Sequence, residues 1–309
     1  MMLAQGISPL YSVYFAPRGY ARMLQMGMQV AQNHLTAFDR LVGVIGEAGS
    51  GKSLLIKGMF PGLELTNDDD GVNVRPLPLL DIHDDTGFYQ AHTYHLDVRF
   101  EAAFTQMHVL ADHIRIAIEK GKRVVVEHFD LIYSALGMNA ALLVGVGEEV
   151  IVSRPTPFGP EPDEVARVVF ASNKYRRMAH TAEDLTERYL AMQGITTFAH
   201  GDVRHGFLLR FREKPDIDTA DLEQFVRSYI QKDVPVSYGD DQHVVIGGEP
   251  HLCTGPRMHV TSTGEIKNFH VLKDMPYDPL SESYILIGLV GEESADVNIR
   301  DLNRIMCGN

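Results

Sequence analysis

Short hydrophobic runs alternate with amphipathic stretches along the first half of the chain. Residues 41–45, 123–126, 141–144 and 149–152 have the length and the branched side chains of buried strands. Between them, residues 99–120 carry apolar side chains at helical spacing. Strands that alternate with helices predict a mostly parallel sheet with right-handed crossovers, which is an α/β fold.

Other segments of this half are less regular. A methionine-rich stretch within residues 1–40 predicts a helix that packs against the sheet, with an adaptable binding surface as the alternative. Residues 63–66 and 72–80 predict two more strands, and the prolines within 72–80 confine that strand to a sheet edge.

The pattern changes after residue 153. Four prolines between residues 155 and 162 form a stiff break, and we place the domain boundary near residue 170, giving domains 1–170 and 171–309. The second half predicts a helix that begins at His180, a strand over 201–211 and an acidic amphipathic helix over 218–232. This order indicates an α+β domain.

The first predicted strand leads into a phosphate-binding motif, G-x-x-x-x-G-K-[ST]. Its residues are Gly46, Glu47, Ala48, Gly49, Ser50, Gly51, Lys52 and Ser53. Glycines let the backbone wrap around a phosphate, and the following helix directs its N-terminal partial charge at the same anion. We expect Lys52 to contact the β- and γ-phosphates and Ser53 to ligate Mg²⁺. The motif therefore predicts a P-loop nucleotide-binding domain.

An acid at the end of a neighbouring strand usually completes such a site. Glu127 follows the run 123–126 and is the first candidate for a Mg²⁺ partner, with Asp130 as the alternative. Asp85 follows the predicted strand 72–80, and is the candidate base that accepts a proton from an attacking hydroxyl. The pattern at Glu127 is loose, because many parallel strands end in an acid.

Composition narrows the functional classes. The net charge of −13 argues against non-specific binding to DNA. Two cysteines in 309 residues provide no disulfide framework, and no apolar run is long enough for a membrane span. The N-terminus lacks a basic segment followed by an apolar one, so we expect no secretory signal and a cytoplasmic location.

The second half resembles the second additional domain of threonyl- and alanyl-tRNA synthetases, which also occurs in free-standing alanyl editing proteins. Three segments carry the resemblance: H-T-A-x-x-L from His180, G-x-V-x-x-G-F over 201–207, and L-C-x-G-P…H-V-x-x-T-G-x-I-x-x-F over 252–269. The resemblance covers about residues 175–275. It implies an editing-type α+β domain and a ligand that resembles an aminoacyl-tRNA or an amino acid.

In that family an H-x-x-x-H pair and a C-x-x-x-H pair line a pocket that binds zinc in alanyl-type members. Here the corresponding positions are His180 and Asp184, and Cys253 with His259. Asp184 replaces the second histidine, and His259 lies two residues later than the family spacing, so Cys253 and His259 converge only if the chain turns between them. The set remains competent for Zn²⁺, and a pocket without metal or a structural remnant are the alternatives. His251 and His205 are spare candidates.

These features predict an ATP-dependent phosphotransferase or ATPase whose second domain recognises an aminoacyl-tRNA-like or amino-acid ligand. ATP is favoured over GTP because no guanine-reading Asn-Lys-x-Asp segment occurs; the nearest string, residues 172–175, lacks the aspartate. A kinase resembling the uridine kinases is consistent with the loop alone. The alternatives are a metal-dependent aminoacyl-tRNA editing hydrolase with nucleotide as regulator, and a non-enzymatic nucleotide-gated RNA-binding or sensor module.

Overall fold

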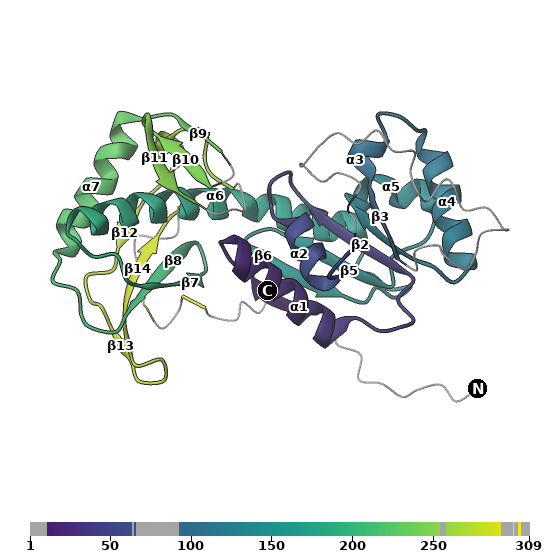
Figure 1. Cartoon of the computed structure of the whole chain (residues 1–309), viewed down its shortest axis with the longest axis horizontal. Helices are drawn as coiled ribbons and strands as arrows, with labels where there is room; N and C mark the ends of the chain where they lie inside the picture. Colours follow the sequence, from purple (N-terminus) through teal and green to yellow (C-terminus); the bar gives the residue numbers. More distant parts are fainter. Residues whose placement is uncertain are drawn as a thin grey trace. The chain divides into compact units, whose positions relative to one another are not determined.

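A computed structural model describes residues 11–63, 65, 93–240, 242–253, 258–291, 299 and 302–303 (Figure 1). The chain divides into two compact units. The first comprises Met1–Tyr14 and Ala21–Ala171, and the second comprises Phe15–Tyr20 and Ser172–Asn309. Each unit has its own hydrophobic core.

A six-stranded sheet forms the centre of the first unit. Its strands are β1 (Tyr11–Phe15), β2 (Leu41–Gly46), β3 (Thr93–Asp97), β4 (Arg123–Glu127), β5 (Leu142–Val146) and β6 (Glu149–Ser153). Their order is β1-β6-β5-β2-β4-β3. Strand β2 runs parallel to both β4 and β5, and β3 is parallel to β4, whereas β6 is antiparallel to β5. The predicted α/β class is confirmed, with a mixed and mostly parallel sheet.

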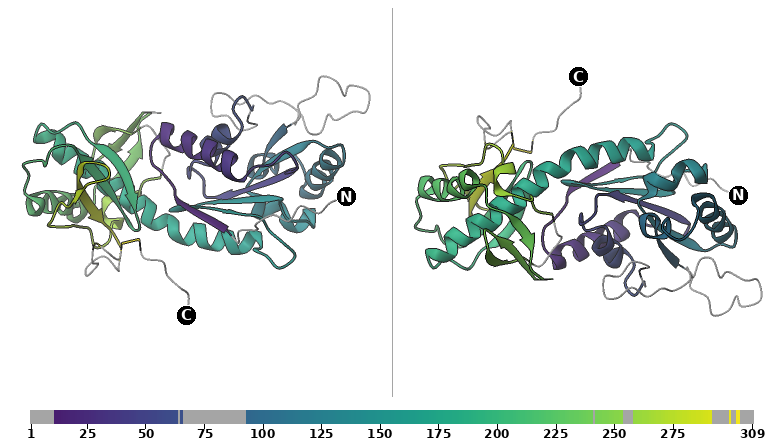
Figure 2. Two further views of the ribbon diagram at one scale, coloured as in Figure 1. Left: turned by 90° about the horizontal axis from the view of Figure 1, so that it is seen from below. Right: turned by 90° about the horizontal axis from the view of Figure 1, so that it is seen from above.

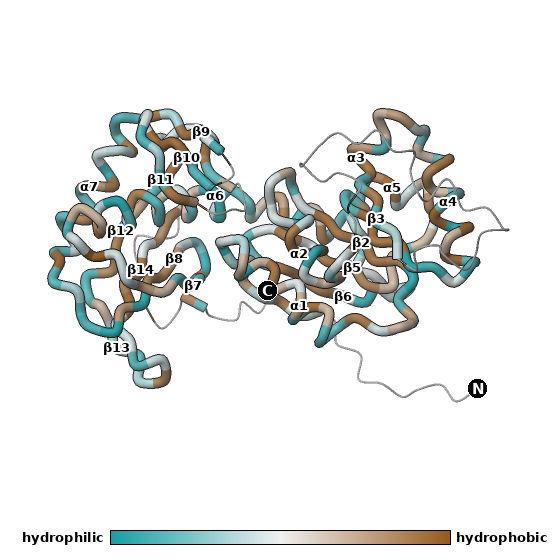
Figure 3. Tube along the Cα trace, in the orientation of Figure 1, coloured by the Kyte–Doolittle hydropathy of each residue, from teal (hydrophilic) through white to brown (hydrophobic). Residues whose placement is uncertain are grey.

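Helices cover both faces of this sheet. They are α1 (Tyr20–His34), α2 (Lys52–Met59), α3 (Val98–Glu101), α4 (Met107–Glu119), α5 (Phe129–Leu136) and the first half of α6 (Pro162–Met192). Side chains of α4, α5 and α6 share one core with β2 and β4, while α1 lies on the opposite face from α6 (Figure 2). Strands β2 and β5 are the hydrophobic centre (Figure 3).

Close backbone contact joins α1 to α2. A Cβ on Gly27 would lie 2.2 Å from the Leu55 carbonyl oxygen, and one on Gly58 would lie 2.2 Å from the Leu24 carbonyl oxygen. Met23 of α1 is fully buried. The methionine-rich stretch therefore forms a packed helix, and α2 is its close neighbour.

Two helix predictions were wrong in detail. Residues 99–120 form two helices and not one, because Asp97 caps the short α3 and a second helix begins at Met107. Phe104, which seemed to continue the helical period, is 68% exposed between them. No helix begins at His180, which lies inside the continuous helix α6. Neither glycine nor proline follows Pro162 within α6, so nothing in the sequence stops the helix before His180.

The second unit is an α+β arrangement of antiparallel sheets. One sheet consists, in order, of β12 (His270–Val271), β14 (Ser283–Leu289), β8 (Gly206–Phe211) and β7 (Ala199–Val203), and β13 (Tyr277–Asp278) pairs with β14. A second sheet consists of β11 (Glu249–Leu252), β10 (His243–Ile246) and β9 (Val236–Tyr238). The second half of α6 and α7 (Thr219–Lys232) share the core with these strands. A short 3-10 helix, η2 (Thr263–Glu265), precedes β12.

The single strand predicted over 201–211 is a hairpin. Strands β7 and β8 pair as antiparallel neighbours, and His205 at the turn has φ of 54°. The predicted helix over 218–232 is confirmed as α7, with Asp218 capping its N-terminus through a hydrogen bond from the Ala220 amide.

Candidate functional sites

In the first unit, the glycine-rich segment 46–53 forms a tight loop between β2 and α2. Gly49 and Gly51 have φ of 77° and 92°, a left-handed conformation that suits glycine. Gly46 has no room for a side chain, because a Cβ there would lie 2.8 Å from Ser50 Oγ. The glycines of the motif are thus required by the backbone conformation and packing of this loop.

The side chain of Lys52, the first residue of α2, folds back over the loop. Its Nζ donates a hydrogen bond to the Glu47 carbonyl oxygen at 2.9 Å and lies 3.8 Å from Glu127 Oε2. Only 5% of Lys52 is exposed. Burial lowers the pKa of its ammonium group, and the carboxylates of Glu127 and Asp97 oppose that effect.

Glu127 ends β4, which pairs directly with β2, so its carboxylate lies beside the start of α2. Its Oε1 accepts hydrogen bonds from the Ser53 hydroxyl at 3.0 Å and from His95 Nε2 at 3.1 Å. Burial alone would raise the pKa of Glu127, but His95, Lys52 and Ser53 lower it below its usual value. The structure therefore brings Lys52, Ser53 and an ionised Glu127 together.

The other predicted acids lie elsewhere. Asp130 is in the first turn of α5, and burial raises the pKa of its carboxyl group. Asp85, the candidate base, lies outside the described residues, as do the predicted strand 72–80 and most of 63–66.

Sequence reasoning missed three residues at this end of the sheet. Asp97 ends β3 and lies opposite Glu127 in the strand register. Glu101 is 7% exposed, and burial followed by the charge of Asp97 raises its pKa to about 7. His128 has φ of 57°, and burial followed by the charge of Lys52 lowers its pKa to about 3. The signal for Asp97 was available, because the segment 93–97 has strand-forming residues with an acid at its end.

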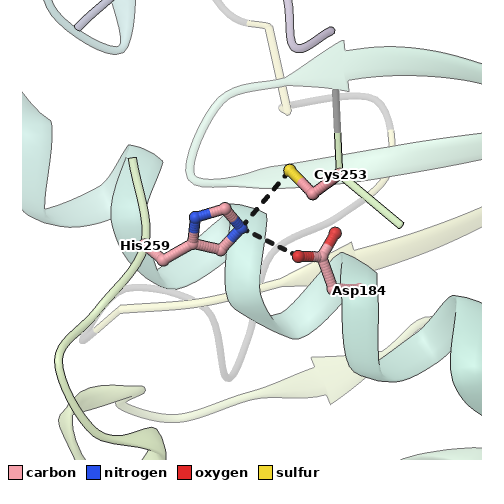
Figure 4. A group of neighbouring side chains, drawn as sticks. All are labelled: Asp184, Cys253 and His259. Carbon is pink, nitrogen blue, oxygen red and sulfur yellow. Dashed lines mark hydrogen bonds and ion pairs between the residues drawn. The ribbon is translucent and has the colours of Figure 1, made fainter. Parts of the chain in front are cut away.

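In the second unit, Asp184, Cys253 and His259 converge on one point (Figure 4). Asp184 comes from α6, Cys253 follows β11, and His259 precedes η2. His259 Nε2 lies 2.8 Å from Asp184 Oδ2 and 3.8 Å from Cys253 Sγ. Cys253 and His259 therefore share one site despite their six-residue separation in sequence, and residues 254–257 between them lie outside the described residues.

The same ring nitrogen of His259 faces both partners, which distinguishes two kinds of chemistry. A Cys-His-Asp catalytic triad uses one ring nitrogen for the nucleophile and the other for the acid. A metal ion instead gathers one atom from each ligand, and bond lengths of about 2.1 and 2.3 Å place nitrogen and sulfur about 3.6 Å apart. The nitrogen–sulfur distance fits two ligands of one metal, whereas the 2.8 Å separation of His259 Nε2 and Asp184 Oδ2 is that of a hydrogen bond. The shared ring nitrogen argues against a triad.

Histidines surround this cluster. His180, the fourth predicted ligand, is not part of the group of three, but its ring centroid lies 5.3 Å from that of His259. His251 Nε2 is 3.8 Å from Asp184 Oδ1. Burial would lower the pKa of His259, but hydrogen bonds with Asp184 and Cys253 raise it to about 9. His205, the other spare candidate, stacks on Tyr175 instead.

A third polar group involves the neighbouring turn of α6. Glu183, Glu187 and His200 also have ligand atoms within 4.8 Å of one another. Glu183 is already paired with Arg18 and accepts a hydrogen bond from His200 at 3.1 Å. Because a cation occupies Glu183, this group is better explained as an ion-pair network.

No family model and no curated protein sequence matches this chain. None of the helices in the described part of the chain is long and apolar enough to cross a membrane.

Proposed function

We propose that the first unit is a P-loop domain that binds ATP with Mg²⁺, and that the protein is an ATP-dependent phosphotransferase or ATPase. The observation that carries this proposal is the convergence of Lys52, Ser53 and Glu127 beyond the carboxyl end of β2. Strand β2 is also the point where the strand order reverses, with β4 on one side and β5 on the other. Open α/β sheets bind ligands at such a position.

Each residue has a distinct role in this proposal. Lys52 leaves the Glu47 carbonyl oxygen and neutralises the β- and γ-phosphates, while the loop amides hold the same oxygens. Ser53 and Glu127, already joined by a hydrogen bond, hold Mg²⁺. When bound, Mg²⁺ neutralises the charge that develops on the transferred phosphoryl group. The proposed base, Asp85, stays a prediction from the sequence.

Substitution of Lys52 tests the nucleotide site. Hydrogen bonds to charged groups contribute about 1.5–3 kcal/mol, so Lys52→Ala is expected to weaken ATP binding about 10- to 100-fold in isothermal titration calorimetry. Lys57→Ala, which removes a lysine from the last turn of the same helix, is the matched control and retains wild-type affinity. Equal ATP affinity in wild type and Lys52→Ala would contradict the assignment of the nucleotide site. Tighter binding of GTP than of ATP would contradict the proposal that the nucleotide carries adenine.

We further propose that the second unit recognises an aminoacyl-tRNA-like or amino-acid ligand, on the resemblance to synthetase editing domains. The geometry of Asp184, Cys253 and His259 favours a second candidate function, a Zn²⁺-dependent editing hydrolase in which nucleotide acts as regulator. Asp184, Cys253 and His259 would hold the Zn²⁺, which would supply a water ligand with a pKa of about 7. Binding of ATP without turnover would select the third candidate, a nucleotide-gated RNA-binding or sensor module.

Metal analysis separates these candidates. The editing hydrolase requires about one equivalent of zinc in the purified protein. Cys253→Ala and His259→Ala are expected to lose this zinc. The control His243→Ala, which removes a half-exposed histidine that pairs with Asp240, is expected to retain it. Hydrolysis of threonine and alanine tRNAs that carry a wrong amino acid is then measured on the same samples. Wild-type protein without stoichiometric zinc would exclude the metal-dependent form.

A further inference from the structure

The carboxyl ends of β3 and β4 hold a group of side chains that the nucleotide-binding motif does not include. Asp97, Glu127 and His128 each offer a ligand atom, and these atoms lie within 4.8 Å of one another. All three residues are buried, with exposed fractions of 7%, 1% and 6%. A metal with ligand bonds of about 2.1 Å spans about 4.2 Å between opposite ligands, so small side-chain shifts close the group around one ion.

We propose that Asp97, Glu127 and His128 form a binding site for a divalent transition metal, such as Mn²⁺ or Co²⁺, at the edge of the nucleotide site. The site consists of two carboxylates and one imidazole. Carboxylates alone suit Mg²⁺, whereas an imidazole ligand shifts the preference toward Mn²⁺, Co²⁺ and Zn²⁺.

His128 is the residue that points to a ligand. Only 6% of the residue is exposed, and no residue in the described part of the chain forms a hydrogen bond with its ring. The ring is therefore open to an external ligand, and neutral imidazole is the form that binds metals.

Hydrogen bonds orient the carboxylates of Asp97 and Glu127. Asp97 Oδ1 accepts hydrogen bonds from the Arg99 and Phe100 amides, which fixes its orientation at the start of α3. His95 donates a hydrogen bond to Glu127 Oε1, the kind of outer contact that orients metal-bound carboxylates. The chain thus supplies oriented ligands from two adjacent strand ends.

Local charge also favours a cation. The negative charges of Glu127, Asp97 and Asp130 act to raise the pKa of Lys52, and the positive charge of Arg99 acts to lower it. Negative charge therefore predominates among these neighbours. A divalent ion without nucleotide balances this excess, and the phosphates of a nucleotide add further ligands when they bind.

Mn²⁺ binding to full-length, chelator-stripped protein without nucleotide tests this inference. The background carries Cys253→Ala and His200→Ala, which disable the other two candidate metal groups of the described residues. Electron paramagnetic resonance of free Mn²⁺ gives the affinity, and spin-echo modulation reports a directly bound imidazole nitrogen. The expected result is about one bound Mn²⁺ with nitrogen coupling, and Mg²⁺ competition only at concentrations more than about tenfold higher.

His128→Gly is the informative variant, because glycine accepts the left-handed backbone of position 128 without strain. It is expected to abolish the nitrogen coupling and weaken Mn²⁺ binding at least about tenfold. His128→Asn, which also tolerates this backbone, checks that the loss follows the imidazole. Unchanged Mn²⁺ affinity in both variants, no nitrogen signal, or equal displacement by Mg²⁺ overturns the inference.

This inference extends the proposed nucleotide function, and the two fail separately. Calorimetry with ATP and Mg²⁺ on the same proteins reports the nucleotide site. ATP binding without Mn²⁺ binding refutes the transition-metal site alone. Mn²⁺ binding without ATP binding refutes the nucleotide function alone.

Discussion

The pair formed by Asp184 and His259 predicts a pH-dependent stability of the second unit in metal-free protein. The hydrogen bond between them is 2.8 Å long, and the His259 side chain is 2% exposed. The raised pKa of His259, about 9 against 6.5 for an unperturbed histidine, corresponds to about 3 kcal/mol at 1.36 kcal/mol per pKa unit. Asp184→Asn removes the charge that sustains this shift while keeping the side-chain shape.

The sign follows from proton binding in the two states. Below pH 6.5 both folded and unfolded chains carry the proton on His259, so the full contribution is present. Between about pH 6.5 and 9 the folded state keeps the proton and the unfolded state loses it, so the free energy of unfolding falls as pH rises. Above pH 9 the contribution is lost. Asp184→Asn is expected to be less stable at pH 6 and to show a flatter pH profile.

Urea unfolding at pH 6 and pH 9.5 in the presence of a chelator measures this effect, with circular dichroism for the whole chain and hydrogen exchange to identify the second unit. Nuclear magnetic resonance titration of the His259 ring gives its pKa directly. Asp240→Asn is the matched control, since Asp240 also pairs with a histidine, His243, but their side chains are 62% and 39% exposed. Exposed ion pairs contribute little, so the control keeps the wild-type pH profile.

A His259 pKa below 7 in wild type would refute this reasoning. So would equal pH profiles for wild type and Asp184→Asn. If the measured pKa of His259 is near 9 but the free energy of unfolding does not change with pH, then the pKa is also raised in the unfolded chain.

Three further outcomes are expected. Gly27→Ala places a Cβ 2.2 Å from the Leu55 carbonyl oxygen and should destabilise the first unit by about 1–3 kcal/mol in thermal unfolding. Gly137→Ala meets no atom within 4 Å but has φ of 67° at the end of α5, so it should cost about 1 kcal/mol through backbone strain alone; a loss as large as that of Gly27→Ala would contradict this distinction. Ser53→Ala should weaken ATP binding about tenfold with Mg²⁺ and leave binding in EDTA unchanged, and equal loss in both conditions would remove Ser53 from the metal site.

The parts of the fold that were predictable from the sequence have strong local signals. The uniformly apolar run 41–45 predicts a buried strand, and the specific glycine motif that follows predicts its loop. Residues 218–232 have a clear helical period. The pairing of Glu127 with Ser53 could be anticipated because a strand that ends in an acid places it at the ligand edge of a parallel sheet.

The parts that were missed depend on contacts between distant residues. Asp97 and His128 meet Glu127 only through strand register and a left-handed backbone, and neither has a signature at fixed sequence spacing. Likewise, helical periodicity continues across residues 102–106 and gives no sign of the break before α4. The family spacing placed His180 in the metal set, whereas the structure groups Asp184, Cys253 and His259 without it.

Helix α6 belongs to both compact units, and this affects how the protein can be dissected. Residues up to Ala171 belong to the first unit and residues from Ser172 to the second, so the boundary lies inside a hydrogen-bonded helix. Val165 and Val169 fill the first core, and Ala182 and Leu185 fill the second. A gene fragment that stops at the boundary ends in a helix of about ten residues, which is too short to be stable without its packing.

Either half is therefore best expressed with the whole of α6, and a fragment of the first unit then exposes the apolar face that packs around Leu185. In evolutionary terms, neither unit can be exchanged at a flexible linker, because the crossover point would interrupt a helix that contributes to two hydrophobic cores.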